Sequence, residues 1–422
     1  MKMSMYNNSI KEFEDGSLLI YNSRSGSLGI LEKEYIEELK TTSNINNKEV
    51  YDVMVEEGFI VNEDLDEFED FISSKINEDN TLQITIAPTF CCNMNCPYCY
   101  ENDNYTKKAI SKDMSDKIFL FIDKYVNQNK IDELVITWYG GEPLLYYDKL
   151  LYLMDKMIET KEKYNLKLYQ SMITNGVFLN YERAKFLNEK YGLKNYQITL
   201  DGSKETNDKR RHLINEKSSF DIILRNMKEI ADIVNISLRT NVDRNNKEDI
   251  KNLYIILKEE GILNKIRLSL SNVYKSESVN KYSGYMGDLE FSKFKINLLG
   301  DIAKIGGNTF FKDNMLDPIE NFCSATMENT FAFDYEGNVY KFWYDLGSEK
   351  KRVGNLNQGK INNIPLENKI KDYCKDCSWL PSCRGDCPRL FADRVSCHIN
   401  KDEFKDIIYY YYMTEGDYEE DY

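Results

Sequence analysis

The cysteines of this chain gather in two short stretches. Four of the ten lie in nine residues from Cys91 to Cys99, and five more lie between Cys374 and Cys397, with Cys323 between the two groups. Disulfides in a small secreted domain would be spread differently, whereas tight cysteine groups in a reducing compartment indicate metal or iron–sulfur ligands. A buried apolar role suits any one cysteine, but not nine in two groups. The chain has only two histidines, which excludes a metal site built from several histidines.

The first group has the spacing of a catalytic iron–sulfur loop. Cys92, Cys96 and Cys99 follow a predicted strand in a CxxxCxxC arrangement. Three thiolates on one loop can hold three irons of a [4Fe–4S] cluster, which leaves the fourth iron open. Structural zinc prefers four ligands, and Cys91 is awkwardly placed beside Cys92 to supply the fourth. We therefore favour a catalytic cluster over zinc and assign no role to Cys91.

The second group is longer and has two CxxC-like pairs. Its members are Cys374, Cys377, Cys383, Cys387 and Cys397. Paired cysteines of this kind also occur in zinc ribbons, so the spacing alone leaves zinc and iron–sulfur ligation open.

Length and composition exclude several classes of protein. The chain has 422 residues, 42% of them hydrophobic, and a formal net charge of −15. These values predict a folded protein of two or three domains and argue against a general nucleic-acid binder. No apolar run approaches the ~20 residues that a membrane span requires, and the N-terminus has a polar centre where a signal peptide is apolar. We expect a cytoplasmic protein.

Strands and amphipathic helices alternate between residues 82 and 270. This pattern predicts a parallel sheet with right-handed crossovers, either an open doubly wound sheet or a partial barrel. The predicted strands are Leu82–Ala87, Glu133–Trp138, Lys167–Ile173, Asn195–Leu200, Asn235–Asn241 and Lys265–Leu270. The predicted helices are Lys112–Val126, Tyr147–Lys163, Tyr181–Tyr191, Ser219–Val234 and Asp249–Glu260.

Two further units flank this α/β region, which we place at residues 81–280. Residues 1–80 combine a hairpin, Ser17–Tyr21 with Ser27–Leu31, and three helical segments, which indicates a winged-helix-like module. Residues 281–422 contain the helix Leu289–Ile305, a hairpin around residues 335–337, the second cysteine group, a last helix at Phe404–Met413 and an acidic tail.

The α/β region resembles the radical S-adenosylmethionine (SAM) superfamily. The CxxxCxxC loop carries an aromatic residue, Tyr98, before its last cysteine. Further motifs follow successive predicted strands: Gly140-Gly141-Glu142-Pro143, Thr174-Asn175-Gly176, Leu200-Asp201-Gly202 and Arg239-Thr240-Asn241. Each match alone is weak, but their order at successive strand ends makes the resemblance specific over about residues 82–270. The resemblance implies a partial (β/α)6 barrel.

The resemblance also implies roles for the motif residues. SAM would chelate the open iron of the [4Fe–4S] cluster, and its reductive cleavage would give a 5′-deoxyadenosyl radical that abstracts a substrate hydrogen. The glycines and Glu142 would meet the methionine end, Tyr98 the adenine, and Asn175 and Asp201 the ribose, while Arg239 would meet the carboxylate. Structural roles remain open as alternatives for three of these residues. Asn175 could form a turn beside Gly176, Asp201 could form a turn or cap a helix, and Arg239 could form a structural ion pair.

The C-terminal cysteines resemble a SPASM domain, which carries auxiliary iron–sulfur clusters. The resemblance assigns Cys374, Cys377, Cys383 and Cys397 to an outer cluster, and Cys323, position 342 and Cys387 to an inner one. Phe342 stands where the family has a cysteine. We therefore expect at least one auxiliary cluster and a lost or reduced inner one, with an oxygen ligand such as Asp317 or Asp345, or open sites for a substrate thiolate, as alternatives.

The whole pattern suggests a peptide-modifying enzyme. Residues 1–80 contain seven Lys and Arg against nineteen Asp and Glu, a surface that repels phosphates but suits a basic leader peptide. The resemblance implies that a ribosomally made precursor peptide docks there and receives a thioether or carbon–carbon crosslink, with flavodoxin or ferredoxin as the reductase and no nucleic-acid or membrane partner. Alternatively, the module is only a structural cap on the barrel.

Two other functions remain as alternatives. The first is an anaerobic sulfatase maturase that forms formylglycine, although the Asp expected after the second SPASM cysteine is Trp343. The second is a non-catalytic iron–sulfur or zinc protein in electron transfer or scaffolding.

Overall fold

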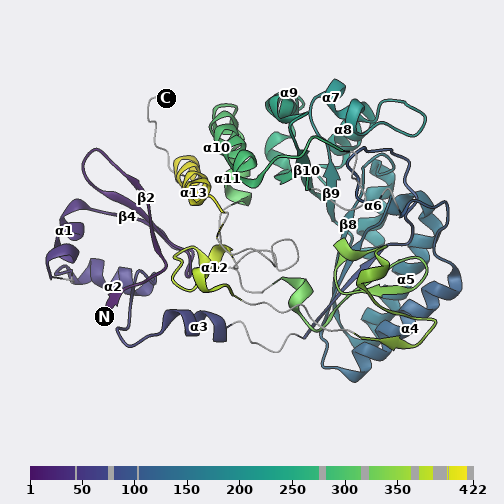
Figure 1. The fold of residues 1–422 in the computed structure, drawn as a ribbon, viewed down its shortest axis with the longest axis horizontal. Helices are drawn as coiled ribbons and strands as arrows, with labels where there is room; N and C mark the ends of the chain where they lie inside the picture. Colours follow the sequence, from purple (N-terminus) through teal and green to yellow (C-terminus); the bar gives the residue numbers. More distant parts are fainter. Residues whose placement is uncertain are drawn as a thin grey trace.

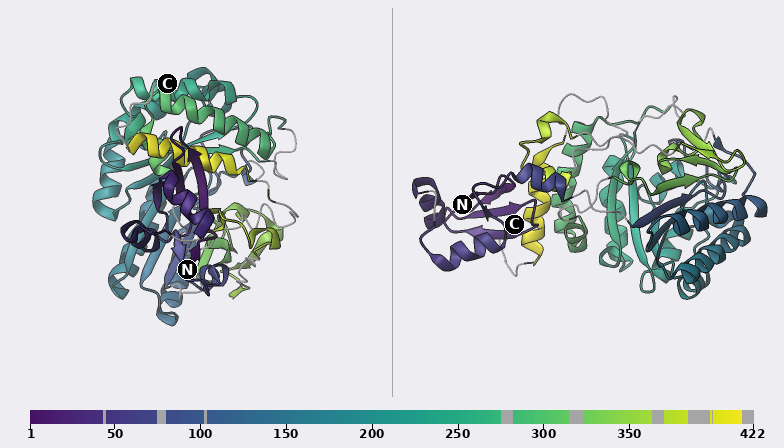
Figure 2. Two further views of the ribbon diagram at one scale, coloured as in Figure 1. Left: turned by 90° about the vertical axis from the view of Figure 1, so that its left-hand side faces the viewer. Right: turned by 90° about the horizontal axis from the view of Figure 1, so that it is seen from below.

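The computed structural model describes residues 1–42, 45–74, 80–101, 104–274, 282–314, 323–362, 370–383, 397 and 399–415. The N-terminal module lies at one end of the molecule and the α/β barrel at the other, with C-terminal helices between them (Figures 1 and 2). Cys387 and Asp317 lie outside the described residues. None of the described helices is both long and apolar enough to cross a membrane.

The central sheet decides between the two predicted architectures. The six strands of the barrel are parallel and are neighbours in their chain order, so every crossover runs in the same direction and the helices cover one face. A doubly wound sheet would reverse this order at a switch point. The structure therefore confirms a partial barrel, built from strands β6 (Thr81–Ile86), β7 (Glu133–Trp138), β8 (Lys167–Ile173), β9 (Asn195–Thr199), β10 (Asn235–Val242) and β11 (Arg267–Asn272).

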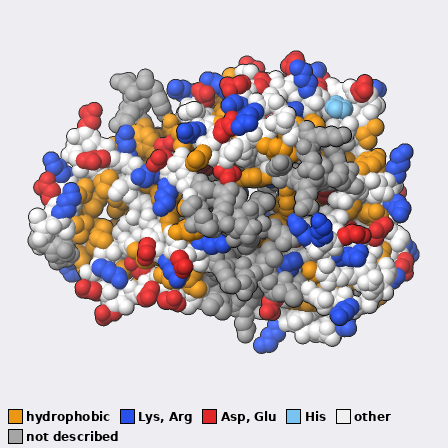
Figure 3. All heavy atoms as spheres, in the orientation of Figure 1, with side chains coloured by type: hydrophobic (Ala, Val, Ile, Leu, Met, Phe, Trp, Pro, Cys, Tyr) orange, Lys and Arg blue, Asp and Glu red, His pale blue; other side chains and the backbone are white. Residues whose placement is uncertain are grey.

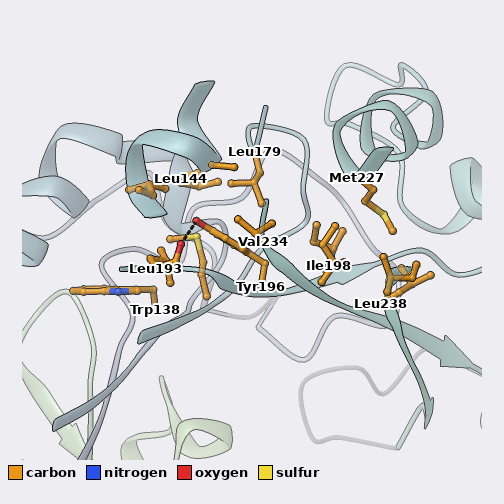
Figure 4. Close-up of a cluster of buried hydrophobic side chains, with 14 of the residues drawn as sticks. Trp138, Leu144, Leu179, Leu193, Tyr196, Ile198, Met227, Val234 and Leu238 are labelled. Atoms are coloured by element: carbon orange, nitrogen blue, oxygen red, sulfur yellow. Dashed lines mark hydrogen bonds between the residues drawn. The ribbon is translucent and has the colours of Figure 1, made fainter. Parts of the chain in front are cut away.

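Alternating side chains along the strands separate the core from the barrel interior. Leu134, Ile136 and Trp138 of β7 are fully buried against the helices, and Figure 4 shows Trp138 and Tyr196 within this core. The intervening Val135 and Thr137 line an interior chamber of about 860 Å³. The covering helices are α4 (Lys112–Gln128), α5 (Tyr147–Tyr164), α6 (Tyr181–Tyr191), α8 (Phe220–Ile230) and α9 (Ile250–Glu259).

Short elements escaped the sequence prediction. Helices α7 (Lys204–Arg210) and α11 (Asn308–Asp313) span only seven and six residues, too few to show a hydrophobic period. Strand β2 (Asn7–Glu12) contains a single apolar residue, Ile10. These elements matter because α7 and β2 both carry contacts described below.

The C-terminal region returns to the barrel sheet. Strand β12 (Thr330–Phe333) pairs in parallel with β6, and an antiparallel extension of β13 (Asn338–Tyr340), β14 (Arg352–Asn355) and β15 (Lys360–Ile361) follows. The predicted hairpin around residues 335–337 is confirmed, with Gly337 at a φ of +77° in its turn. Because β12 adjoins β6, the residues after β13 lie beside the strand ends of the barrel.

The N-terminal module has a three-stranded sheet in the order β2–β3–β4, with β3 at Leu18–Asn22 and β4 at Leu28–Leu31. Its core contains Ile20, Met54 and Phe59. The C-terminal helix α13 (Lys401–Glu415) contacts β2, which leaves β4 as the uncovered edge among the described residues. The remaining elements of the module are β1 (Lys2–Met3), α1 (Lys33–Thr42), α2 (Lys48–Glu56), β5 (Ile60–Val61) and α3 (Glu67–Ser73). Outside the module, helix α10 (Asp288–Lys304) packs beside α13. The predicted hairpin and three helices of this module are present, and its winged-helix-like character stays a prediction.

Candidate active site

The cysteine loop follows β6 at the carboxyl end of the barrel. Cys96 is 9% exposed, and the backbone N–H of Cys99 donates to the Cys96 carbonyl over 3.1 Å, which turns the loop back on itself. Burial raises the pKa of the Cys92 thiol to about 12. Bound iron would therefore displace protons from these thiols and hold them as thiolates.

The donor set suits a cluster better than a single ion. Among the described residues, no group of three or more Cys, His, Asp or Glu side chains is arranged to hold one metal ion. In a [4Fe–4S] cluster each thiolate binds a different iron, so the sulfurs of Cys92, Cys96 and Cys99 need not converge on one point. Three cysteines on one loop after β6 fit such a cluster.

The two motif glycines pack directly on this loop. A Cβ atom at Gly141 would lie 2.4 Å from the Cys91 carbonyl oxygen, and one at Gly140 would lie 2.3 Å from that of Thr89. The N–H of Gly141 donates to the Thr89 carbonyl, and the N–H of Glu142 to the Cys91 carbonyl. The glycines thus permit close approach of the β7 end to the cysteine loop, a contact that the sequence did not predict.

Glu142 connects two strand ends. Its side chain is fully buried, and its carboxylate accepts from the N–H groups of Leu144 (3.0 Å) and Asn175 (2.8 Å) and from the Thr174 hydroxyl (2.8 Å). Burial raises the pKa of this carboxyl, and the hydrogen bonds oppose that shift. Glu142 therefore ties the end of β7 to the end of β8.

Asn175 contacts the cysteine loop itself. Its amide nitrogen donates to Asn93 Oδ1 over 2.7 Å and lies 3.8 Å from the Cys92 sulfur, while its oxygen accepts from the Val177 N–H. The side chain therefore stabilises its local turn and also contacts the loop.

Asp201 lies at the centre of a buried polar network. Its carboxylate accepts from the Tyr98 hydroxyl, from the Asn241 N–H over 3.0 Å and from Arg210 Nε over 3.4 Å. Arg211 also donates to the Tyr98 hydroxyl, over 2.8 Å. The loop aromatic Tyr98 is thereby fixed to the end of β9.

A cavity of about 230 Å³ lies over these strand ends. Its polar lining includes Tyr98, Arg211, Arg239 and Asn241. Arg239 Nε donates to Asn241 Oδ1 over 2.8 Å, and burial lowers the pKa of its guanidinium. No carboxylate of the described residues forms an ion pair with Arg239, so the structural ion pair considered from the sequence is not found.

Aromatic side chains close the cavity from several elements. Tyr100 follows the cysteine loop, Tyr139 follows β7, and Trp343 and Tyr344 follow β13. The Tyr139 and Trp343 rings meet edge to face at 5.4 Å, and the Tyr100 and Tyr139 hydroxyls are hydrogen-bonded. Among the described residues of the lining there is no Asp, Glu, Lys or His.

A family model described as the radical SAM superfamily matches residues 86–256, which contain all of the motifs above. Residues 86–256 of this chain form a radical SAM domain. A domain of this family implies a [4Fe–4S] cluster that binds SAM, and the cysteine loop after β6 could hold it.

Several known proteins are similar to most of this chain. The enzyme is 26% identical over 340 residues to a cysteine-type anaerobic sulfatase-maturating enzyme of Clostridium perfringens, covering 73% of this chain and 89% of the relative. Native anSMEcpe with bound AdoMet and Cp18Cys peptide superposes with a TM-score of 0.58 and 21% identity over 79% of this chain and 96% of that chain. Streptococcus suis SuiB bound to precursor peptide SuiA superposes with a TM-score of 0.51 and 13% identity, over 94% of this chain and 97% of that chain. The two structures show a shared fold.

Two members of the second cysteine group, Cys374 and Cys377, pack against the N-terminal module. Cys374 is 8% exposed and packs with Tyr6 and Phe71, and the Cys377 N–H donates to the Cys374 carbonyl over 3.1 Å. Trp379 stacks on Tyr21 at 6.0 Å. Cys383 ends a short helix, α12 (Leu380–Cys383), and Cys397 is exposed. The outer cluster on these four cysteines stays a prediction.

Phe342 contributes packing at the position where the family has a cysteine. Its ring lies 5.1 Å from that of Trp343, and both side chains line the barrel chamber. Asp345, one of the oxygen ligands considered, is buried and forms an ion pair with Lys351 at 3.4 Å. Cys323 is half-buried just before the turn that leads to β12. The loss or reduction of the inner cluster stays a prediction, because Cys387 lies outside the described residues.

Sequence reasoning missed Arg210, Arg211, Tyr139 and the aromatic residues after β13. The pair of arginines after the Asp201-Gly202 motif was the available signal, since two adjacent guanidinium groups near a buried Asp require partners. The role of Trp343 depends on β12 pairing with β6, which no local pattern reveals.

Proposed function

We propose that this radical SAM enzyme is a peptide maturase that abstracts a hydrogen from a ribosomally made precursor peptide and installs a thioether or carbon–carbon crosslink. SAM bound to the [4Fe–4S] cluster supplies a hydrogen-abstracting radical. The chain's own residues would hold SAM at the strand ends, exclude water with the aromatic side chains over the cavity, and dock the peptide.

The observation that carries this proposal is a groove on the N-terminal module. An apolar cavity of about 310 Å³ lies between strand β4 and helix α2, and its lining includes Ile30, Leu31, Val53 and Met54. Ile30 is 46% exposed and Val53 55% exposed, and Figure 3 shows apolar side chains gathered on this end of the molecule. Exposed apolar surface beside a free strand edge is typical of a peptide-docking site.

The groove indicates the chemistry of the leader. Strand β4 offers backbone hydrogen bonds to an added strand, and the groove offers pockets for apolar side chains. Glu32 and Glu49 stand in the lining, so basic residues beside the apolar ones would be favoured. We therefore expect a leader with an apolar segment flanked by Lys or Arg.

The arrangement of the molecule fits a two-part substrate. The N-terminal module, which carries the groove, and the barrel lie at opposite ends of the molecule (Figure 2), so one short peptide segment cannot fill both sites. The SuiB superposition covers 94% of this chain, which leaves too few residues unmatched to omit the N-terminal module. A leader docked on the module and a separate core segment in the barrel would satisfy this geometry.

The test is leader-dependent modification. The enzyme is reconstituted anaerobically and incubated with SAM, reductant and the short peptide encoded beside it. We expect a loss of two hydrogens from the peptide that disappears when the leader is removed. Equal modification of the leaderless peptide would contradict docking on the module.

A matched pair of variants tests the groove directly. Val53→Glu places a charge in the apolar groove, and Leu120→Glu makes the same change at a side chain that is 60% exposed on helix α4 of the barrel. Val53→Glu is expected to weaken leader binding about tenfold or more, a change of about 1.4 kcal/mol in binding free energy. Leu120→Glu is expected to leave leader binding unchanged.

A second candidate is an anaerobic sulfatase maturase. The 26% identity over 73% of this chain favours it, since that relative is named for this activity. The lining of the barrel cavity counts against it, because Trp343 stands where that group has a proton-accepting Asp and no carboxylate replaces it among the described residues. Conversion of a cysteine in a sulfatase-derived peptide to formylglycine would establish this second function.

A further inference from the structure

The segment after helix α7 is hydrogen-bonded to the backbone of the cysteine loop. The Asn95 N–H donates to the His212 carbonyl over 3.2 Å, and the Ile214 N–H donates to the Asn93 carbonyl over 3.0 Å. Met94 and Leu213 form a bridge between these contacts. The backbone on both sides of Met94 is therefore hydrogen-bonded to this segment. Because Arg211 immediately precedes His212, these contacts hold Arg211 at a defined place beside the loop.

The Arg211 side chain is directed at the loop. It is 7% exposed, one terminal nitrogen donates to the Tyr98 hydroxyl over 2.8 Å, and the other lies 3.9 Å from the Met94 sulfur. Met94 lies between Cys92 and Cys96, and Tyr98 between Cys96 and Cys99. The guanidinium therefore contacts both spans of the loop that separate its three cysteines.

Arg211 differs from its neighbour Arg210 in how its charge is balanced. Arg210 forms ion pairs with Asp201 at 3.4 Å and Asp243 at 2.8 Å. Arg211 forms no ion pair with a described carboxylate, reaches Asp201 only through the Tyr98 hydroxyl, and leaves its buried Nε without a hydrogen-bond partner in the described structure. A buried guanidinium with an unpaired donor lowers the stability of the fold, so a purely structural role accounts for it poorly.

We propose that Arg211 is a positioning residue whose buried positive charge raises the reduction potential of the cluster on Cys92, Cys96 and Cys99. A one-electron reductant adds an electron to the oxidised cluster without making or breaking a bond, and the reduced cluster carries one more negative charge. A nearby cation at low dielectric stabilises that added charge. Arg211 thus eases the reduction on which SAM cleavage depends, and this inference rests on the cluster assignment in the proposed function.

The test is a redox titration followed by electron paramagnetic resonance. The holoenzyme is reconstituted, and the signal that changes on addition of SAM identifies the cluster of the cysteine loop. Arg211→Gln removes the charge, Arg211→Lys retains it, and Lys209→Gln removes an exposed charge from the same helix end. Arg211→Gln is expected to lower the equilibrium constant for one-electron reduction at least tenfold, or 59 mV, whereas Arg211→Lys retains most of the wild-type potential and Lys209→Gln all of it.

Each outcome decides the inference. An Arg211→Gln signal of normal intensity at the wild-type potential would overturn it. If the Arg211→Gln variant holds no cluster, the Arg211→Lys variant decides. An equilibrium constant for reduction that falls tenfold or more in Arg211→Lys, despite the retained charge, would show that hydrogen bonding and not charge sets the reduction potential, and would overturn the inference. Failure of the cluster assignment is distinguishable, since the wild-type enzyme would then give no SAM-sensitive signal.

Discussion

At the scale of single residues, the structure distinguishes the proposed iron ligands from the cysteine that precedes them. Cys91 and Cys92 are adjacent, yet the Cys91 sulfur lies 3.8 Å from the Tyr105 hydroxyl while the Cys92 sulfur lies beside Asn175. Replacing Cys92, Cys96 or Cys99 by Ala is expected to remove about four irons per chain and to abolish SAM cleavage. Cys91→Ala is the matched control in an iron assay and is expected to retain its iron. Iron loss in that variant would contradict the ligand assignment.

Glu142 shows how a motif residue stabilises the site. Glu142→Gln replaces one carboxylate oxygen by an amide that donates, and it then faces the donor N–H of Leu144 or Asn175. We expect a loss of about 1–3 kcal/mol in the free energy of unfolding of the iron-free chain. Glu133→Gln, at the start of strand β7, breaks the surface ion pair with Lys167 and should lose about 0.2–1 kcal/mol. Equal losses in chemical denaturation would argue against the buried bridge.

The sequence identified the motif residues but not their partners. Four motif residues are predicted to contact SAM: Tyr98, Glu142, Asn175 and Asp201. In the structure, Tyr98 is hydrogen-bonded to Asp201, and Asn175 is hydrogen-bonded to Glu142 and to Asn93 of the cysteine loop. Their roles in binding SAM stay predictions. Arg211 could not be paired with Tyr98 in advance, because 113 residues separate them.

At the scale of elements, close packing of two strand ends shapes the site. Gly141→Ala would place a Cβ atom 2.4 Å from the backbone oxygen of Cys91, which cannot move away as a flexible side chain could. We expect a loss of about 1–3 kcal/mol in the free energy of unfolding and a lower iron content. Gly287→Ala, where no atom lies within 4 Å of the added Cβ, is the control. A stable, fully iron-loaded Gly141→Ala variant would show that the two loops need not pack this closely.

Lys341 fixes the hairpin that carries the aromatic residues to the cavity. Its ammonium donates to the backbone carbonyls of Met327, Glu328 and Thr330, and burial lowers its pKa to about 8. Between about pH 8 and the ordinary lysine pKa, the unfolded chain binds more protons than the folded chain, so this group makes the fold more stable as pH rises. Compared with Lys341→Met in denaturant titrations, the wild type should gain in free energy of unfolding from pH 8 to 10. A difference that stays constant with pH would refute the lowered pKa.

Hydrophobic periodicity was sufficient for the long elements of the barrel. The predicted bounds of Glu133–Trp138, Lys167–Ile173 and Tyr181–Tyr191 agree with the structure to the residue. The choice between barrel and open sheet required the strand order, which periodicity does not contain. The polar strand β2 was missed because its stability comes from its pairing with β3 and its contact with α13.

At the scale of the whole molecule, the N-terminal module packs against the segment that carries Cys374 and Cys377. Asn8 and Ser23 donate to the Ser378 carbonyl, and these contacts join residues more than 350 positions apart. No sequence pattern predicts such a junction. It places the proposed leader groove and the proposed outer cluster in one structural unit.

Iron content tests the number of clusters. With Phe342 at the inner site, two [4Fe–4S] clusters are expected, or about 8 Fe per chain, against about 12 for three clusters. Replacing Cys374 by Ala should lower the count to about 4 and weaken leader binding, because Cys374 packs against Tyr6 and Phe71 of the module. A wild-type count near 12 would contradict the loss of the inner cluster.

Formal charge divides along the same lines as the proposed functions. Residues 1–80 carry a net −12 and residues 415–422 a net −5, which leaves the barrel and its C-terminal extension nearly neutral. Most of the acidity thus belongs to the module that would bind a basic leader, and the rest to the C-terminal tail.

Mass spectrometry of the neighbouring precursor peptide tests the central claim most directly. The peptide is incubated anaerobically with reconstituted enzyme, SAM and reductant, and 5′-deoxyadenosine is quantified in the same sample. We predict that the peptide loses two hydrogens in step with 5′-deoxyadenosine formation. An unchanged peptide mass alongside active SAM cleavage would contradict a precursor-peptide maturase.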